Sequence, residues 1–349
     1  MNVLFLYTEI ADYFLKCCET LSKSAAVHII RWPLNQEAPF DFNYPEGIKV
    51  YEKEEYSREK LKELTASIHP DIIICSGWLD KDYLAVTKDY FKKIPTVLTC
   101  DTHWRASAKQ YLAMALSRFF LLNTFSHGWV PGKIQRTYLN KLGFRDSNIH
   151  EGFYSCDLNK FNALYVRNKK IKEKAIPKRF LYVGRYFDFK GLADLWQAFV
   201  ELQKEQSNDW ELWCLGAGDL EPIQHPKIKH FGFVQPKDLD PILEECGVFV
   251  LPSRFEPWGV VVQEYAAAGF PLLLSSAVGA KEVFLDDNKN GFLFSPSSLE
   301  EIKNALKKVI NLSGKALILM AERSHELAQA NSPEKWANTV IKIYNESKK

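Results

Sequence analysis

The sequence lacks the features that mark several large classes of protein. Its 45 Lys and Arg residues nearly balance 43 Asp and Glu residues, which leaves a formal net charge of +2 over 349 residues. No global positive field therefore argues for nucleic acid as a partner. The longest apolar stretch, residues 111–125, is interrupted by Arg118 and Asn123, and a membrane-spanning helix needs about 20 apolar residues. The apolar residues 3–7 are followed at once by Glu9, so we expect no signal peptide.

Cysteine and histidine also form no recognisable framework. The seven cysteines show no repeated C-x-x-C spacing, and several lie inside apolar runs. We interpret them as reduced core residues of a cytosolic protein. The eight histidines have no metal-ligand spacing. Asp238 and Asp240 have the spacing of a metal-binding D-x-D, but a proline and a helix follow, so we expect helix capping instead. The sequence predicts no metal site.

Short apolar runs recur along the chain and alternate with segments of helical length. Such runs, four to six residues long, are typical of buried parallel strands in βα units. The pattern occurs in two halves of similar size, so the sequence predicts an α/β protein with two doubly wound, Rossmann-like domains. The runs are residues 2–7, 26–31, 48–51, 71–75, 96–100 and 128–130, then 179–183, 211–215, 228–231, 248–251, 271–274 and 291–294.

Composition predicts the domain boundary. Residues 162–178 are basic, lack apolar periodicity and end with a proline before a strand, as a solvated linker does. The alternative is that this basic run touches an acidic membrane surface. We therefore assign residues 1–165 to the first domain and 166–331 to the second. Residues 332–349 are predicted to form a helix that Ser332 caps.

The first loop that could carry chemistry follows the strand at residues 179–183. Arg185 and Lys190 lie on this loop between Gly184 and Gly191, at the carboxyl edge of the sheet, where open α/β sheets bind ligands. Two cations in this setting can hold a pyrophosphate. The alternative is an ordinary solvated loop with two surface cations.

A second loop of this kind follows the strand at residues 248–251. Glu256 lies in the loop, Gly259 permits close approach of the backbone, and a helix is predicted to begin near Val260. A helix N-terminus offers free N–H groups to a phosphate, and Glu256 with Glu264 could accept hydrogen bonds from sugar hydroxyls. The alternative makes Glu264 a surface residue and gives Trp258 a packing role.

Three other segments are weaker candidates. Residues 275–283 form a loop of small residues after another strand. Residues 215–219 resemble half of a dinucleotide fingerprint but lack its third glycine. In the first half, Asp101, His103 and Arg105 cluster after a strand and could meet a substrate, or could only make hydrogen bonds within a loop.

In this order and spacing, these segments resemble retaining glycosyltransferases of family 4, which have the GT-B fold. The family's G-R-x(n)-K-G pattern appears at residues 184–191, and its E-x7-E pattern appears as Glu256 and Glu264. The likeness covers nearly the whole chain and points to bacterial enzymes of cell-surface polysaccharide or lipopolysaccharide assembly. It implies two Rossmann-like domains that face a cleft, with the last helix crossing back to the first, acceptor-side domain.

The resemblance also implies a set of roles. The donor would be a nucleotide-diphosphate sugar bound by the second domain, and the acceptor a glycan or lipid-linked molecule on the cytoplasmic side of a membrane. Arg185 and Lys190 would hold the diphosphate, Glu256 the sugar hydroxyls and Glu264 the ribose. No cofactor and no metal would be needed. The donor-binding residues would be Gly184, Phe233, Val234, Trp258, Gly259, Val260, Glu264 and Gly279, with residues 232–235 near the base.

The sequence departs from the family pattern in three places. Residues 8–13 contain no glycine where many members have a glycine-rich loop. Asp101 stands where many members have the His of a His-Thr pair, so either Asp101 or His103 would face the donor sugar. Ala280 replaces the second glycine of a usual Gly-Gly. The alternatives are another GT-B activity, such as a sugar-nucleotide epimerase, or an inactive partner subunit.

Residues 101–145 combine basic charge with apolar side chains. One acidic residue, Asp101, accompanies seven basic ones, which leaves a formal charge of +6. Such a stretch could make a peripheral contact with anionic lipid. We favour the simpler interpretation that positions 111, 112, 115, 116 and 119 face the core of the first domain. The apolar residues of this stretch are Tyr111, Leu112, Met114, Leu116, Phe119, Phe120 and Leu121, and the basic ones are Arg105, Lys109, Arg118, Lys133, Arg136, Lys141 and Arg145.

Overall fold

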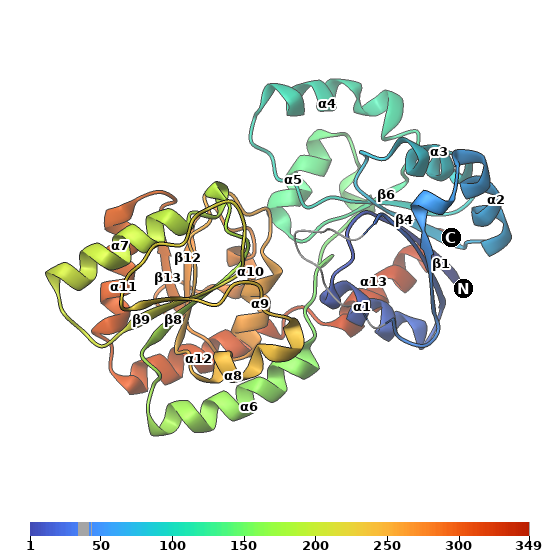
Figure 1. Cartoon of the computed structure of the whole chain (residues 1–349). Coiled ribbons are helices and arrows are strands. Elements are labelled where there is room, and N and C mark those ends of the chain that lie inside the picture. The colour runs from blue at the N-terminus through green and yellow to red at the C-terminus, as the bar shows by residue number, and fades with distance from the viewer. Residues whose placement is uncertain (34–41, 43, 349) are drawn as a thin grey trace. The chain divides into compact units, whose positions relative to one another are not determined.

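The chain folds into two compact units, seen in a computed structural model that describes residues 1–33, 42 and 44–348 (Figure 1). Unit 1 consists of Met1–Asp157 together with Asn331–Lys349, and unit 2 of Leu158–Ala330. Both units are built around a parallel sheet with helices, as the alternating apolar runs predict. The predicted α/β class with two doubly wound domains is therefore confirmed.

Unit 1 contains a seven-stranded sheet in the order β3-β2-β1-β4-β5-β6-β7, and all of its pairings are parallel. Its inner strand β1 has four side chains with no exposed surface, because a parallel strand covered on both faces must be apolar on both. The strands are β1 Asn2–Tyr7, β2 Ala26–Arg31, β3 Ile48–Glu52, β4 Ile72–Ser76, β5 Thr96–Thr99, β6 His127–Trp129 and β7 Ile149–His150. The helices are α1 Asp12–Ser22, α2 Arg58–Ile68, α3 Lys81–Tyr90, α4 Ala108–Phe120, α5 Lys133–Lys141 and α13 Pro333–Glu346.

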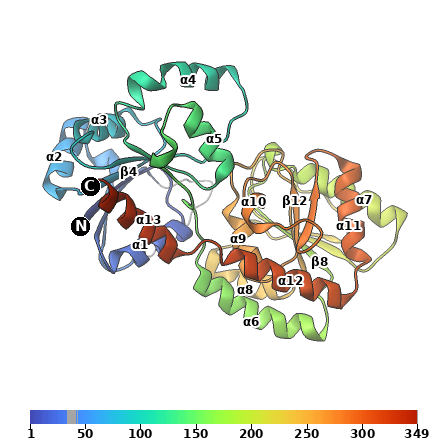
Figure 2. The same cartoon turned by 180° about the vertical axis from the view of Figure 1, so that it is seen from behind.

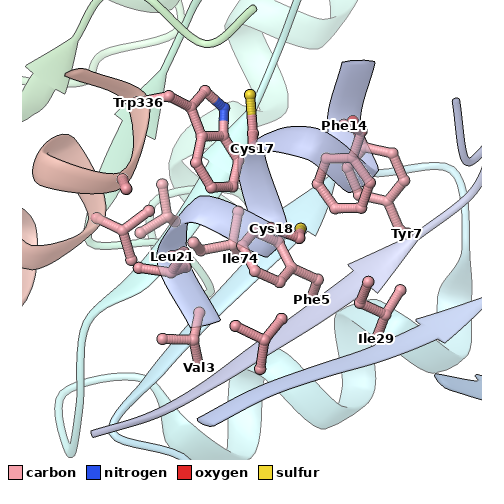
Figure 3. Close-up of a cluster of buried hydrophobic side chains, with 14 of the residues drawn as sticks. Val3, Phe5, Tyr7, Phe14, Cys17, Cys18, Leu21, Ile29, Ile74 and Trp336 are labelled. Carbon is pink, nitrogen blue, oxygen red and sulfur yellow. The ribbon is translucent and has the colours of Figure 1, made fainter. Parts of the chain in front are cut away.

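The last helix, α13, belongs to unit 1, as predicted. Ser332 caps it by accepting a hydrogen bond from the N–H of Lys335 at 3.2 Å. The helix runs beside α1 (Figure 2). Trp336 enters the core from α13 and packs near Phe5 and Cys17 (Figure 3). Its indole N–H donates to the carbonyl of Phe153 at 2.7 Å, so the buried ring keeps a polar partner.

Unit 2 contains a six-stranded sheet in the order β10-β9-β8-β11-β12-β13. Helices α7 and α11 pack against each other, and α6, α9 and α12 form a second packed group (Figure 1). The strands are β8 Arg179–Val183, β9 Glu211–Leu215, β10 Ile228–His230, β11 Val248–Leu251, β12 Leu272–Ser275 and β13 Gly291–Phe294. The helices are α6 Leu158–Lys174, α7 Leu192–Glu205, α8 Asp240–Glu244, α9 Val260–Ala267, α10 Lys281–Phe284, α11 Leu299–Ile310 and α12 Gly314–Ala328.

The predicted linker at residues 162–178 is wrong over most of its length. Helix α6 occupies Leu158–Lys174 and buries Phe161 and Leu164. The many basic side chains in the second half of α6, from Arg167 to Lys174, conceal the helical spacing of its buried residues. The division of the chain consequently falls between Asp157 and Leu158.

The capping role predicted for Asp238 and Asp240 is also wrong. Helix α8 begins at Asp240 with Leu239 before it, and neither residue gives a side-chain cap. The carboxylate of Asp240 instead accepts a hydrogen bond from Arg167 of α6 at 2.5 Å. The short α8 is thus fixed to α6 by an ion pair.

The expectation that α4 turns its apolar side chains to the core is wrong as well. Tyr111, Leu112, Leu116 and Phe119 are all exposed, and Phe119 retains 75% of its surface. The two buried residues of α4 are Gln110 and Ser117. No helix among the described residues has the length and hydropathy to cross a bilayer.

The seven cysteines lie among the described residues, and each is buried with a free thiol. Burial raises the pKa of six of these thiols, so they are poor thiolates at neutral pH: Cys17, Cys18, Cys75, Cys100, Cys214 and Cys246. Their placement agrees with the predicted role as small core residues.

Candidate active site

The sheet of unit 2 has one position where its strand order reverses. The chain passes from β8 outward to β9 and β10, then returns to β11 on the other side of β8. The connections that follow β8 and β11 therefore continue toward opposite ends of the sheet. In open α/β sheets the carboxyl edge at such a place binds ligands. Arg185 and Lys190 lie on the loop after β8, and Glu256 lies on the loop after β11.

Lys190 and Glu256 meet directly at this position. The Lys190 ammonium donates to the Glu256 carboxylate at 2.5 Å, and their side chains are only 14% and 12% exposed. The hydroxyl of Ser253 donates to the same carboxylate oxygen at 3.4 Å. The structure thus brings together two predicted site residues that stand 66 positions apart in the chain.

Backbone hydrogen bonds hold these two loops against each other. The carbonyl of Phe189 accepts from the N–H groups of Arg254 and Phe255 at 2.8 and 3.2 Å. Gly191 adopts a φ of 66°, and a Cβ there would lie 2.2 Å from the carbonyl oxygen of Pro252. A side chain at position 191 would therefore push the Lys190 loop away from Glu256.

Arg254 adds an ionic brace between the same loops, which the sequence did not reveal. Its guanidinium makes two hydrogen bonds to Asp194, in the first turn of α7, at 2.8 and 2.9 Å. It also donates to both carboxylate oxygens of Asp188 at 2.8 Å. The hydrogen bonds and charges of Asp194 and Asp188 raise the pKa of Arg254 above its usual value. A planar group with several donors suits this double fork, which lysine could not reproduce.

Arg185 has a different environment. Its side chain is exposed, and the guanidinium lies 5.1 Å from the centre of the Phe187 ring. The hydroxyl of Tyr182 donates to its carbonyl at 2.9 Å. The segment 215–219 braces this loop, because the N–H of Tyr186 donates to the carbonyl of Ala217 at 2.9 Å. Residues 215–219, which resemble half of a dinucleotide fingerprint, therefore pack against the Arg185 loop in this structure.

The loops after β11 and β12 are also joined through their backbones. The N–H of Gly279 donates to the carbonyl of Glu256 at 3.0 Å, and Ala280 donates to Trp258 at 2.9 Å. The indole of Trp258 is 2% exposed and packs near Phe284, so its side chain belongs to the core. The small residues of the loop after β12 thus hold the Glu256 loop in place through these backbone hydrogen bonds.

Helix α9 begins where the sequence places it. Gly259 precedes it with a φ of 93°, and a Cβ there would meet Glu256 at 3.1 Å, so a bulkier residue would strain this turn. Val260 opens the helix, and Glu264 lies about one turn inside it, half-buried. The partly buried segment 232–235 follows β10 at the same edge of the sheet.

The residues predicted in the first half belong to unit 1. Asp101 accepts a hydrogen bond from the hydroxyl of Tyr154 at 3.2 Å, and burial raises the pKa of that tyrosine. The carbonyl of His103 accepts from the side chain of Gln110 at 2.8 Å. Within the described residues, no group of three or more His, Cys, Asp or Glu side chains is placed to hold a metal ion.

The C-terminus of α9 is held by polar side chains that sequence reasoning missed. Lys172 of α6 donates to the carbonyl of Gly269 at 2.7 Å, and Asn168 donates to Ala268 at 3.1 Å. His325 of α12 makes a third hydrogen bond, to Ala267, at 2.7 Å. These side chains satisfy carbonyls that a helix end leaves without partners. Helical spacing from Phe161 onward is the signal that could have found α6.

Comparison with known proteins finds a family model that matches most of unit 2. Residues 166–331 match the model of the glycosyl transferases group 1 family. Unit 2 is therefore similar to glycosyl transferases group 1 over most of its length. The loops at residues 184–191 and 252–259 lie inside the matched range. The match ends one residue beyond unit 2, so this domain corresponds closely to the second compact unit.

Individual relatives are distant and match part of their length. A Methanocaldococcus jannaschii protein named as an uncharacterized glycosyltransferase is 25% identical over 177 residues, which cover 48% of this chain and 44% of the relative. A Rhizobium meliloti lipopolysaccharide core biosynthesis glycosyltransferase is 27% identical over 153 residues, covering 41% and 42%. The chain thus spans less than half the length of these relatives.

Solved structures share the whole fold. Anabaena HepE in complex with UDP and glucose has a TM-score of 0.71 at 16% identity, with 99% of both chains covered. A sucrose-phosphate synthase from Thermosynechococcus elongatus has a TM-score of 0.73 at 16% identity, covering 99% and 98%. This likeness confirms the predicted GT-B fold.

Buried Lys172 should make the stability of unit 2 depend on pH. Burial lowers the pKa of Lys172 to about 7, whereas an unfolded lysine titrates near 10.4. Between these values unfolding takes up a proton, so the free energy of unfolding should rise with pH, by up to about 1.4 kcal/mol per pH unit. We expect Lys172→Met to flatten this rise in urea unfolding between pH 7 and 10.

The exposed Lys174 on the same helix provides the matched control. Lys174→Met should keep the pH slope of the unmodified protein. Equal slopes for Lys172→Met and the unmodified protein would show that Lys172 stays charged in the folded state.

Proposed function

We propose that this protein is a glycosyltransferase that binds a nucleotide-diphosphate sugar at the loops after β8 and β11. The observation that carries the proposal is the Lys190–Glu256 pair, which sets a cation and a carboxylate side by side at the carboxyl edge of the sheet. A diphosphate requires cations, and a sugar requires acceptors for its hydroxyls. The family of unit 2 and the UDP complex of HepE support this choice of ligand.

Each residue has a role in this proposal. Arg185 and Lys190 hold the diphosphate, and Glu256 accepts hydrogen bonds from the sugar hydroxyls. Glu264, one turn inside α9, accepts from the ribose. Gly184, Gly259, Val260 and Gly279 contribute backbone to the donor site, with Phe233 and Val234 beside the base, while Trp258 supports its loop from the core.

The Lys190–Glu256 contact gives the free site a defined starting state. The carboxylate keeps the ammonium at the crevice while no phosphate is bound, since an unpaired, largely buried charge is costly. When the donor arrives, its diphosphate offers Lys190 a second anionic partner. The Glu256 carboxylate, released from Lys190, then accepts hydrogen bonds from the sugar hydroxyls.

The reaction proposed is sugar transfer with retention of configuration. The bond between the anomeric carbon and the phosphate oxygen breaks, and the bond to the acceptor oxygen forms on the same face. The acceptor proton passes to the departing phosphate. Arg185 and Lys190 stabilise the negative charge that develops on the diphosphate, a contribution made elsewhere by a metal ion. Asp101 or His103 of unit 1 is proposed to contact the donor sugar.

The acceptor is proposed to be a glycan or a lipid-linked molecule in surface polysaccharide assembly on the cytoplasmic side of a membrane. The Rhizobium meliloti relative, named for lipopolysaccharide core biosynthesis, supports this class. The family-4 assignment and the retaining outcome rest on the motif at residues 184–191 and on the Glu256 and Glu264 spacing.

Removing either phosphate-binding cation should greatly reduce turnover. We expect Arg185→Ala and Lys190→Ala each to lower kcat/KM about 100-fold, because a lost donor to a developing charge costs about 3 kcal/mol. Release of nucleoside diphosphate from a panel beginning with UDP-glucose measures this effect.

Lys307→Ala, which removes an exposed cation from α11, is the control and should leave turnover unchanged. Unmodified turnover in both site variants would contradict the assignment. Release of an altered free sugar without any acceptor would instead favour an epimerase.

The reaction is proposed to need no metal, because the two cations supply the charge. Turnover of the same donor should therefore persist after incubation with EDTA. A complete loss that manganese or magnesium restores would contradict the proposed mechanism.

A further inference from the structure

Helix α4 of unit 1 is amphipathic, but it buries polar side chains and exposes its apolar face. Its polar residues Gln110 and Ser117 are buried, whereas Leu112 is 60% and Phe119 75% exposed. An ordinary surface helix turns its apolar stripe to the core. In both views α4 lies at the outer margin of its unit (Figures 1 and 2).

Polar contacts fix this orientation. The side chain of Gln110 accepts from the N–H of Arg105 and donates to the carbonyl of His103, both at 2.8 Å. Gln110 also completes a capping box with Ser107 at the helix start. Rotating α4 to bury its apolar side would break all of these bonds, so the exposed face is built into the helix.

The exposed apolar side chains form one continuous stripe. Successive residues of a helix turn by about 100°, so positions separated by three or four residues share a face. Lys109 and Arg118 fall on opposite flanks of this stripe by the same geometry. The stripe consists of Ala108, Tyr111, Leu112, Ala115, Leu116 and Phe119, all of which are exposed.

The segment that carries the stripe is rich in basic residues. No acidic residue occurs between Thr102 and Arg145, although seven basic ones do. Lys141 lies 4.8 Å from the Trp104 ring, which packs 5.0 Å from Tyr111, so a third cation lies near the start of the helix. An acidic protein surface or an anionic lipid surface would complement this charge.

We propose that the α4 stripe docks peripherally on an anionic lipid bilayer. A single convex helix with leucines and aromatics between flanking cations is suited to the headgroup boundary, because its apolar side chains can insert while the cations reach lipid phosphates. The proposal goes beyond the proposed function and does not rest on it, since the stripe lies outside the donor-binding residues.

Vesicle flotation of the whole chain tests this docking. The protein should float with vesicles of phosphatidylcholine and phosphatidylglycerol at low salt and dissociate as salt rises. It should not float with phosphatidylcholine alone. Leu112→Ser with Phe119→Ser should abolish flotation. Lys109→Gln with Arg118→Gln should weaken it about 30-fold, since each cation contributes about fivefold near such a surface.

Matched variants in unit 2 provide the controls. Leu319→Ser removes another exposed leucine, and Lys307→Gln with Lys308→Gln removes two exposed cations. Both should float like the unmodified protein, and all variants should keep donor turnover in solution. Failure to float with anionic vesicles, or equal flotation of the α4 variants, would overturn the proposal. A dimer in light scattering that Leu112→Ser with Phe119→Ser dissociates, without vesicle binding, would make the stripe a self-interface and would also overturn it.

Discussion

The contact between Lys190 and Glu256 is the constraint on which the proposed donor site of unit 2 depends. Two largely buried charges at 2.5 Å contribute little net stability, because the desolvation cost offsets their attraction. Several other features of the structure nonetheless hold the two loops together. Phe189 joins the loops through its carbonyl, Gly191 permits their close approach, and Arg254 braces both. Such support for an ion pair with a high desolvation cost is expected where the two charges bind a ligand.

Much of this architecture could be predicted from the sequence. Strands β1, β2, β8, β9, β11 and β13 have the predicted bounds, because each is a largely buried run next to clear turn residues. These strand positions also predict that the loops carrying Arg185, Lys190 and Glu256 lie at one edge of the sheet, because parallel strands have their carboxyl ends on the same edge. The two-residue strand β7 was missed because it is too short to show any pattern.

What could not be predicted depends on partners remote in the chain. The brace between Arg254 and Asp194 joins residues 60 positions apart. Lys172 appeared to be part of a basic linker, yet it is buried against the end of α9. In α4 the apolar spacing correctly indicated a helix but not which side faces the protein, because the hydrogen bonds of Gln110 decide that. Local rules fail at such places, and these are often functional.

The most direct test of the account is calorimetric titration of UDP and GDP into the unmodified protein, Arg185→Ala and Glu256→Gln. The account predicts that one nucleotide binds the unmodified protein and binds Arg185→Ala at least tenfold more weakly. Glu256→Gln should bind that nucleotide as tightly or more tightly, because Lys190 no longer has a competing carboxylate, but should lose affinity for the corresponding nucleotide sugar. Equal affinity of the nucleotide for the unmodified protein and Arg185→Ala, or no binding of either nucleotide, would contradict a diphosphate site between the β8 and β11 loops.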